Sequence, residues 1–211
     1  MAYGFLDRLS TPSVQAAQTA NGARQIWERF DGDRPSDRFT PSEAGFIAER
    51  DSFYLASVSQ SGWPYVQHRG GPAGFLKVLD ETTLGFADYR GNRQYISLGN
   101  TAADDRVSLI LMDYPNQTRL KILAHMQARD LTADPDLAAR LVDPGYKGRP
   151  ERGFVLKLEA FDWNCPQHIT RRFTGPEIET VLSPLRRELA ALEIQNQALR
   201  TQIAALTETR R

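Results

Sequence analysis

Two arginines flank a glycine and an asparagine in the segment Arg90-Gly91-Asn92-Arg93, where a predicted strand hands over to a predicted helix. A glycine turn that opens a helix presents backbone N–H groups and the positive end of the helix dipole to an anion. Guanidinium groups beside such a turn match phosphate oxygens in bidentate fashion. Either arginine alone would more often be a solvated surface residue. Together with the turn, they predict an anion site on the rim of a β-structure.

Three more cationic residues, His68, Arg69 and Lys77, lie in or beside strands that otherwise have the composition of a core. Unpaired charge in such a position is expensive, so these residues are further candidates for a binding site. Two plainer interpretations remain open. His68 can be a hydrogen-bonded structural residue, and Lys77 can point from an edge strand into water.

Other kinds of reactive site find no support in the sequence. The three histidines show no metal-ligand spacing, and the chain has neither an HExxH nor a CxxC motif, so we expect no metal site. The single cysteine, Cys165, precedes a proline and is expected to be structural; it allows no internal disulfide. No Rossmann, P-loop or nucleophile-elbow pattern occurs.

The elements that would position these residues are mostly strands. From Asp51 the hydrophobic period changes to two, and several of the resulting runs are joined by short polar turns. Short connections favour antiparallel neighbours, so the pattern predicts a mainly β fold, a small barrel with flanking helices. The expected strands are 53–58, 64–68, 75–79, 83–88, 107–114, 120–129 and 154–163.

Helices are expected before and between these strands. Thr40-Pro41-Ser42-Glu43 forms a capping box that starts a short helix ending near Arg50. A second helix is expected from about Asn92 to Gly99-Asn100, and a third over 134–141, where Asp and then Pro again provide the cap. Thr11-Pro12 gives the same signal near the N-terminus.

The C-terminal region has a heptad stripe, a set of a and d positions spaced alternately by four and three residues. Asn196 at an a position favours a parallel two-stranded pair, because each amide finds its mate across the axis. Glu188 and Glu193 would repel each other in that pair, so charge does not select the partner. The alternative is a helix that lies on its own barrel. The stripe comprises Leu185, Leu189, Leu192, Asn196, Leu199, Ile203 and Leu206.

Composition limits the partners and the organisation. Lysine plus arginine and aspartate plus glutamate number 26 each, which argues against a nucleic-acid binder with a broad cationic face. No run approaches the roughly 18 apolar residues of a membrane span, and no signal peptide is evident, so we expect a cytoplasmic protein. We divide the chain into an N-terminal helical arm (1–38), a barrel domain (39–170) and a C-terminal helix (171–211).

Six blocks follow one another along the chain: residues 65–72, 77–80, 85–95, 105–107, 111–114 and 163–169. In this order they resemble the pyridoxamine 5′-phosphate oxidase-related family of FMN-binding proteins. The resemblance covers roughly residues 40–170 and implies an FMN-binding split barrel that forms a homodimer, with one FMN at each subunit junction.

The resemblance also implies site residues. Arg69, Arg93 and Arg90 would hold the phosphate, and Lys77, the one candidate catalytic residue, would lie near the pyrimidine end of the flavin ring. Asn92 and Gln94 would hold the ribityl chain, and Gln67, His68 and the Gly70-Gly71 backbone would line the edge of the ring. Asn164, Gln167 and His168 would close the site, either from the same chain or from the partner chain. The full set implied to bind the cofactor is Gln67, His68, Arg69, Gly70, Gly71, Lys77, Ala87, Asp88, Arg90, Gly91, Asn92, Arg93, Gln94, Asn164, Gln167 and His168.

The activity implied by the resemblance is that of an FMN-dependent oxidoreductase, with hydride passing through flavin N5 from a nicotinamide or a small organic substrate. The arginine–histidine stretch that binds substrate in the vitamin B6 oxidase is missing, so pyridoxamine phosphate is not implied. A non-catalytic flavin carrier or redox sensor is the alternative. A related cofactor such as F420 and, more weakly, an empty scaffold remain open.

Overall fold

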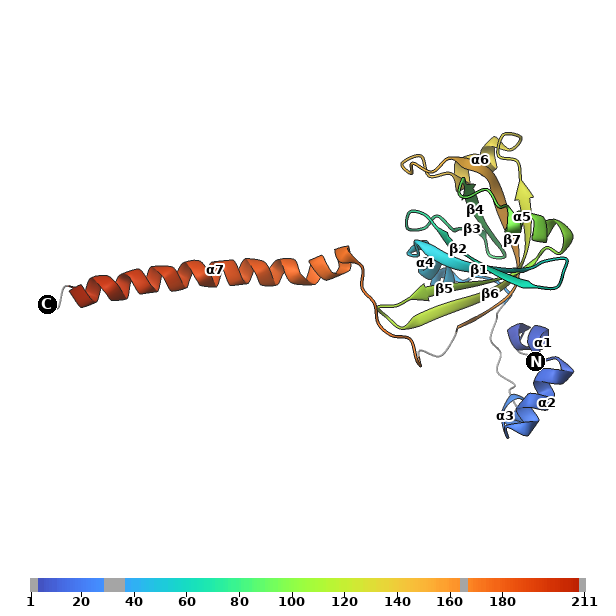
Figure 1. Ribbon diagram of the computed structural model, residues 1–211, viewed down its shortest axis with the longest axis horizontal. Coiled ribbons are helices and arrows are strands. Elements are labelled where there is room, and N and C mark those ends of the chain that lie inside the picture. Colours follow the sequence, from blue (N-terminus) through green and yellow to red (C-terminus); the bar gives the residue numbers. More distant parts are fainter. Residues whose placement is uncertain (1–3, 29–36, 164–166, 209–211) are drawn as a thin grey trace. The chain divides into compact units, whose positions relative to one another are not determined.

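The computed structural model describes residues 4–28, 37–163 and 167–208 of the chain (Figure 1). It contains two compact units, Met1–Ile169 and Thr170–Arg211. The first unit holds the whole sheet with its flanking helices, and the second consists of one long helix and the segment that leads into it.

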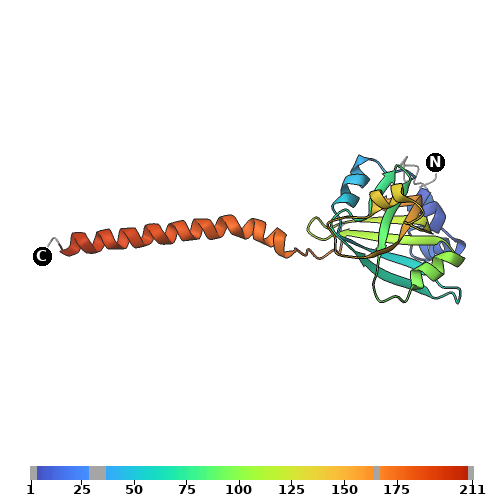
Figure 2. The ribbon, with the colours of Figure 1, turned by 90° about the horizontal axis from the view of Figure 1, so that it is seen from above.

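The first unit is built on one seven-stranded sheet in which every neighbouring pair is antiparallel. The sheet curls around its core (Figures 1 and 2), and its strand order is β2-β1-β5-β6-β7-β4-β3. All seven predicted strands are therefore confirmed. Their bounds are β1 Ser52–Val58, β2 Pro64–Gly70, β3 Lys77–Asp80, β4 Thr83–Tyr89, β5 Arg106–Asp113, β6 Thr118–Arg129 and β7 Pro150–Trp163.

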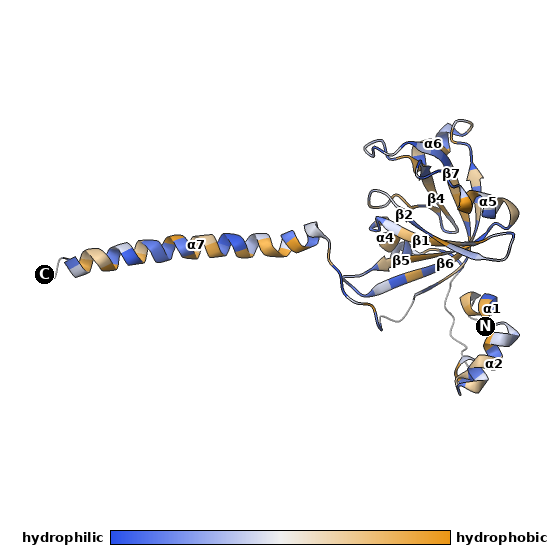
Figure 3. Ribbon diagram, in the orientation of Figure 1, coloured by the Kyte–Doolittle hydropathy of each residue, from blue (hydrophilic) through white to orange (hydrophobic). Residues whose placement is uncertain are grey.

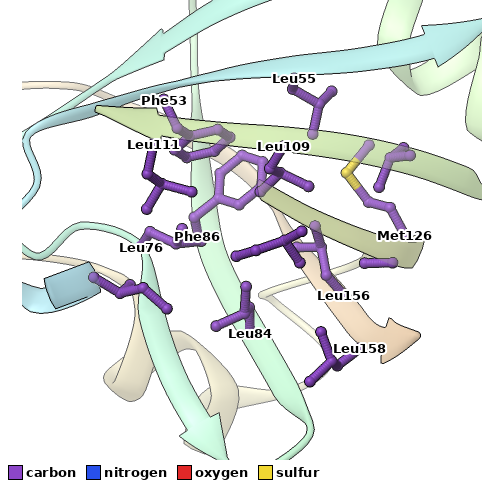
Figure 4. Packing of buried hydrophobic residues seen from close by; sticks show 14 of the residues in the cluster. Phe53, Leu55, Leu76, Leu84, Phe86, Leu109, Leu111, Met126, Leu156 and Leu158 are labelled. Atoms are coloured by element: carbon purple, nitrogen blue, oxygen red, sulfur yellow. The ribbon is translucent and has the colours of Figure 1, made fainter. Parts of the chain in front are cut away.

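Alternation along the strands determines which face of the sheet is buried. In β5 every second residue is buried, and the leucines at 109 and 111 point into the core (Figure 4). The rings of Phe53, Phe86 and Phe154 meet at the centre with centroids 5.3 Å apart in each successive pair. Because these aromatic side chains bury large apolar areas, this cluster holds the barrel together.

The helices α4 Pro41–Ala48, α5 Ile96–Ala103 and α6 Pro135–Leu141 flank the sheet. The predicted capping box at Thr40 is present: Thr40 N–H and Oγ1–H both donate to the Glu43 carboxylate, and Ser42 N–H donates to Thr40 Oγ1. The indole N–H of Trp163 donates to the other Glu43 oxygen at 2.7 Å. Glu43 thus fastens α4 to the end of β7.

The described part of the N-terminal arm is helical, as predicted, and consists of three short helices. It forms α1 Gly4–Leu9, α2 Pro12–Ala20 and α3 Arg24–Glu28. The chain leaves the helix at Gly22, whose φ of +69° is in the left-handed region that glycine tolerates. Phe5 of α1 is buried, and its ring lies under the Lys121 ammonium group, 4.7 Å from the centroid.

The second unit contains α7 Gly175–Glu208, a helix of 34 residues. At 1.5 Å per residue it spans about 51 Å. Pro184 lies within it, and polar and apolar residues alternate along its length (Figure 3). Among the described helices, α7 included, none is long and apolar enough to cross a membrane.

Candidate functional site

The turn between β4 and α5 does not have the predicted shape. The helix begins at Ile96 rather than near Asn92, because Arg93 and Tyr95 have left-handed backbones with φ of 63° and 54°. Asn92 Oδ1 accepts a hydrogen bond from the Gln94 N–H and closes a local turn that competes with the helix. Backbone strain of this kind is often retained at binding sites.

The turn forms one wall of a cavity of about 220 Å³. Six of the predicted site residues meet there, and Arg69 and Arg93 share the cavity although 24 positions separate them in the sequence. The lining residues are Gln67, Arg69, Asp88, Tyr89, Gly91, Asn92, Arg93, Tyr95, Ile96, Leu98 and Glu151.

Arg69 crosses the gap between the sheet's edge strand β2 and the far strand β4. Its Nη1 lies 2.6 Å from Asp88 Oδ1, and both side chains are largely buried. Arg152 at the start of β7 brings its Nε to 3.3 Å from the other Asp88 oxygen. The ion pairs therefore hold together three strands around the cavity.

Burial raises the pKa of the Asp88 carboxyl, and the guanidinium groups of Arg69 and Arg152 oppose that shift. The two arginines thereby keep a charged carboxylate in a site that would otherwise disfavour it. The sequence interpretation treated Arg69 as a phosphate ligand only. The structure gives it a structural partner as well, Asp88, which the sequence could not pair with it.

Arg69 also has an unsatisfied donor. Among the described residues its Nε is buried without a hydrogen-bond partner, as are those of Arg119 and Arg152. Such groups are costly. Because Arg119 does not line the cavity, this feature is not specific to the site.

The outer edge of the cavity is a chain of polar contacts. Arg93 Nε donates to the Tyr95 hydroxyl at 3.4 Å, and that hydroxyl donates to Glu151 Oε1 at 3.3 Å. Arg90 Nε approaches the same carboxylate at 3.5 Å. Arg93 is exposed, so its guanidinium group can turn to a ligand without breaking a buried contact.

The charged residues that line the cavity balance each other, Arg69 and Arg93 against Asp88 and Glu151. Arg90 and Arg152 contact the same two carboxylates from outside the lining, and with them the cluster carries a net charge of +2. A phosphate monoester carries about −1.5 to −2 at neutral pH. The donor set therefore fits a phosphate group.

Gln67 is held in place from the facing helix. The Ser97 hydroxyl donates to Gln67 Oε1 at 2.9 Å, and Ser97 is buried in the first turn of α5. Because its carbonyl oxygen is occupied, the Gln67 side chain is oriented with its amide group fixed at the cavity wall.

The remaining predicted residues do not line the cavity. His68 faces outward and packs edge-to-face on Tyr54, with centroids 5.5 Å apart. Packing explains why position 71 is glycine, because a Cβ there would lie 2.7 Å from the Phe75 ring. Lys77 pairs with Gly85 in the edge strand β3. Also outside the cavity lining are Gly70, Ala87, Arg90, Gln94, Gln167 and His168, and Asn164 lies outside the described residues.

Two charged residues of the site were missed in the sequence. Glu151 lines the cavity, and Arg152 stacks its guanidinium group over the Tyr95 ring at 5.0 Å. The uncharged lining residues Tyr89, Tyr95, Ile96 and Leu98 were missed as well. The predicted strand began only at Phe154, whereas β7 begins at Pro150. Two adjacent charges at the start of a core strand were the available signal.

A larger cavity of about 500 Å³ is lined by residues of α1, β1, β5 and β6. Its charged residues are already engaged: Arg8 pairs with Glu159, and Arg106 with Asp104. It contains none of the predicted site residues. Within the described ranges, no three His, Cys, Asp or Glu side chains gather as a metal site requires.

Comparisons with known proteins identify the family of the chain. The family model described as pyridoxamine 5′-phosphate oxidase matches residues 39–154, more than half of the chain. No curated protein matches significantly.

Among solved structures, a candidate pyridoxamine 5′-phosphate oxidase from Lactobacillus delbrueckii is 21% identical, with a TM-score of 0.46 over 61% of this chain and 96% of that one. An FMN-binding protein from Syntrophomonas wolfei is 13% identical (TM-score 0.45, 72% and 95%). An F420 reductase is 18% identical (TM-score 0.42, 58% and 98%).

Proposed function

Because the chain belongs to the pyridoxamine 5′-phosphate oxidase family, we propose that it is an FMN-dependent oxidoreductase that holds the FMN phosphate between Arg69 and Arg93. The observation that carries the proposal is the cavity that Arg69 and Arg93 share, whose two carboxylates are also paired with Arg90 and Arg152. Gly91 adds room, since no atom lies within 4 Å of the place where a Cβ would stand.

Residues of this chain would bind and orient the cofactor. Arg93, on a left-handed turn, would close over the phosphate, while Asp88 fixes the Arg69 guanidinium group and Ser97 fixes Gln67. When bound, FMN would supply hydride transfer with a nicotinamide or small organic substrate. Lys77 would stabilise the negative charge that develops on the reduced ring.

We further propose that a second copy completes the site. The cavity is smaller than the ≈ 300–1,000 Å³ of typical ligand sites, so the flavin ring must extend beyond it. β1, β2 and the turn between them expose four large apolar side chains, Tyr54, Val58, Trp63 and Val66. Exposed apolar side chains that cluster in this way suit an interface between copies.

The visible spectrum of the purified protein tests the cofactor. We expect the two absorption bands of oxidised flavin, and a colourless protein that takes up no added FMN would contradict the proposal. Oxidation of NADH or NADPH by the holoprotein tests turnover. A flavin that stays oxidised with every donor would instead support a carrier or sensor.

Lys77→Ala separates binding from turnover. We expect FMN to remain bound and its reduction to slow by about 10- to 100-fold, because a preorganised charge near the ring is lost. Stopped-flow reduction measures this rate. Reduction at the wild-type rate would remove Lys77 from the mechanism.

A further inference from the structure

The heptad stripe of α7 is longer than the sequence alone indicated. Because the helix begins at Gly175 and continues through Pro184, Ile178 and Leu182 join the stripe at d and a positions. Leu189, Leu192 and Ile203 are 55–63% exposed, and no residue of α7 is buried. The stripe therefore has no partner within its own unit, which contains no other helix or strand among the residues described.

A second pattern runs beside the stripe, in the e positions of the same heptads. Glu179, Arg186, Glu193 and Arg200 recur every seven residues and alternate in sign. The structure confirms that the first two lie on one side of the helix, since Arg186 Nη1 is 2.8 Å from Glu179 Oε1. Charges at e positions determine partner and orientation in paired helices.

A parallel pair does not use this column. Its e positions face g positions of the other helix, and the g column of α7 (Val181, Glu188, Gln195 and Gln202) contains only one charge. That charge meets its like, because Glu188 would face Glu193 of the second copy. The parallel arrangement thus gives two repulsive contacts by symmetry and no attractive one.

An antiparallel pair brings e positions against e positions. When Leu189 lies opposite Leu192 of the second copy, Arg186 faces Glu193 and Glu179 faces Arg200 of that copy. Symmetry doubles both contacts, which gives four attractive pairs along the described length of the helix. We propose that α7 pairs with α7 of a second copy in this antiparallel register.

Asn196 favours the parallel arrangement, because there its side-chain amide would hydrogen-bond to the amide of Asn196 in the second copy. In the antiparallel register Asn196 faces Leu185 of the second copy and must bond to water at the open side of the pair. The parallel pair gains this one amide contact, but it also has two repulsive charge contacts and lacks the four attractive contacts of the antiparallel pair. The charges therefore decide the orientation.

Single-cysteine variants test the register in the full-length chain. Two chains are made on a Cys165→Ser background, one with Leu182→Cys and one with Leu199→Cys. Each chain is expressed alone, and the two are also co-expressed. All samples are purified under reducing conditions and then mildly oxidised. The proposed register puts Leu182 opposite Leu199 of the second copy. Only the co-expressed sample should form a covalent dimer on a non-reducing gel. Covalent dimers from either variant alone would show a parallel pair. The absence of covalent dimers in every sample would show that α7 does not pair in this register. Either result would overturn the proposal.

Charge reversal in the co-expressed pair sharpens the test. Arg186→Glu in both chains should slow cross-linking about five- to tenfold, because attraction to Glu193 becomes repulsion. Adding Glu193→Arg should restore the original rate. In a parallel pair Arg186 faces Val181, so an unchanged rate in Arg186→Glu would contradict the antiparallel arrangement.

Discussion

The barrel buries its apolar side chains, whereas α7 leaves its apolar side chains exposed to solvent. In the barrel the side chains of Phe53, Phe86 and Leu109 are at most 1% exposed, whereas Leu192 of α7 is 55% exposed. The barrel satisfies its hydrophobic pattern with contacts from its own chain. The helix has an equally regular pattern and no residues of its own unit to bury it. Periodicity therefore predicts an element, but not whether its partner is in the same chain.

The largest contrast should appear when one large side chain is removed from each region. Phe86→Ala removes the central ring of the aromatic cluster and should cost about 3–5 kcal/mol of unfolding free energy. Leu192→Ala should leave the barrel's urea midpoint unchanged. A comparable loss in the two variants would mean that α7 packs on its own barrel.

The two arginines of the cavity give a smaller contrast within the barrel. Arg69→Ala deprives buried Asp88 of its shorter ion pair and should destabilise the protein by about 2 kcal/mol, less than a full buried pair because Arg152 remains. Arg93→Ala should stay within about 0.5 kcal/mol of wild type, since Arg93 is exposed. Denaturant unfolding of the cofactor-free proteins compares them, and equal losses would refute the division of roles.

The smallest effect concerns Glu43 and is visible only through pH. Burial raises its pKa, but hydrogen bonds from Thr40 and Trp163 outweigh burial and hold it below the ordinary value. A carboxyl with a depressed pKa stabilises the fold at pH values above its unfolded pKa and loses this contribution as pH falls through the folded one. Glu43→Gln should therefore lower Tm at pH 7 and converge with wild type at pH 3. A constant difference across that range would exclude a role for the charge.

Local rules sufficed for much of the barrel. The capping box of α4 and the seven alternating runs depend only on residues close together in the sequence, so they could be predicted from it. The Arg69–Asp88 pair joins β2 to β4 across the opening of the sheet, and no local pattern encodes that distance. The start of α5 was misplaced because the side chain of Asn92 and two left-handed residues form a turn instead of the first helical turn.

Discrimination between FMN and riboflavin tests the phosphate site most directly, because the two ligands differ only in the phosphate. Fluorescence titration of the cofactor-free protein should give a Kd for FMN about 100-fold or more below that for riboflavin, the effect of two or more charged hydrogen bonds. In Arg93→Ala the advantage of FMN should fall by about tenfold while riboflavin binding is unchanged. Equal affinity of the wild-type protein for both ligands would contradict a phosphate site between Arg69 and Arg93.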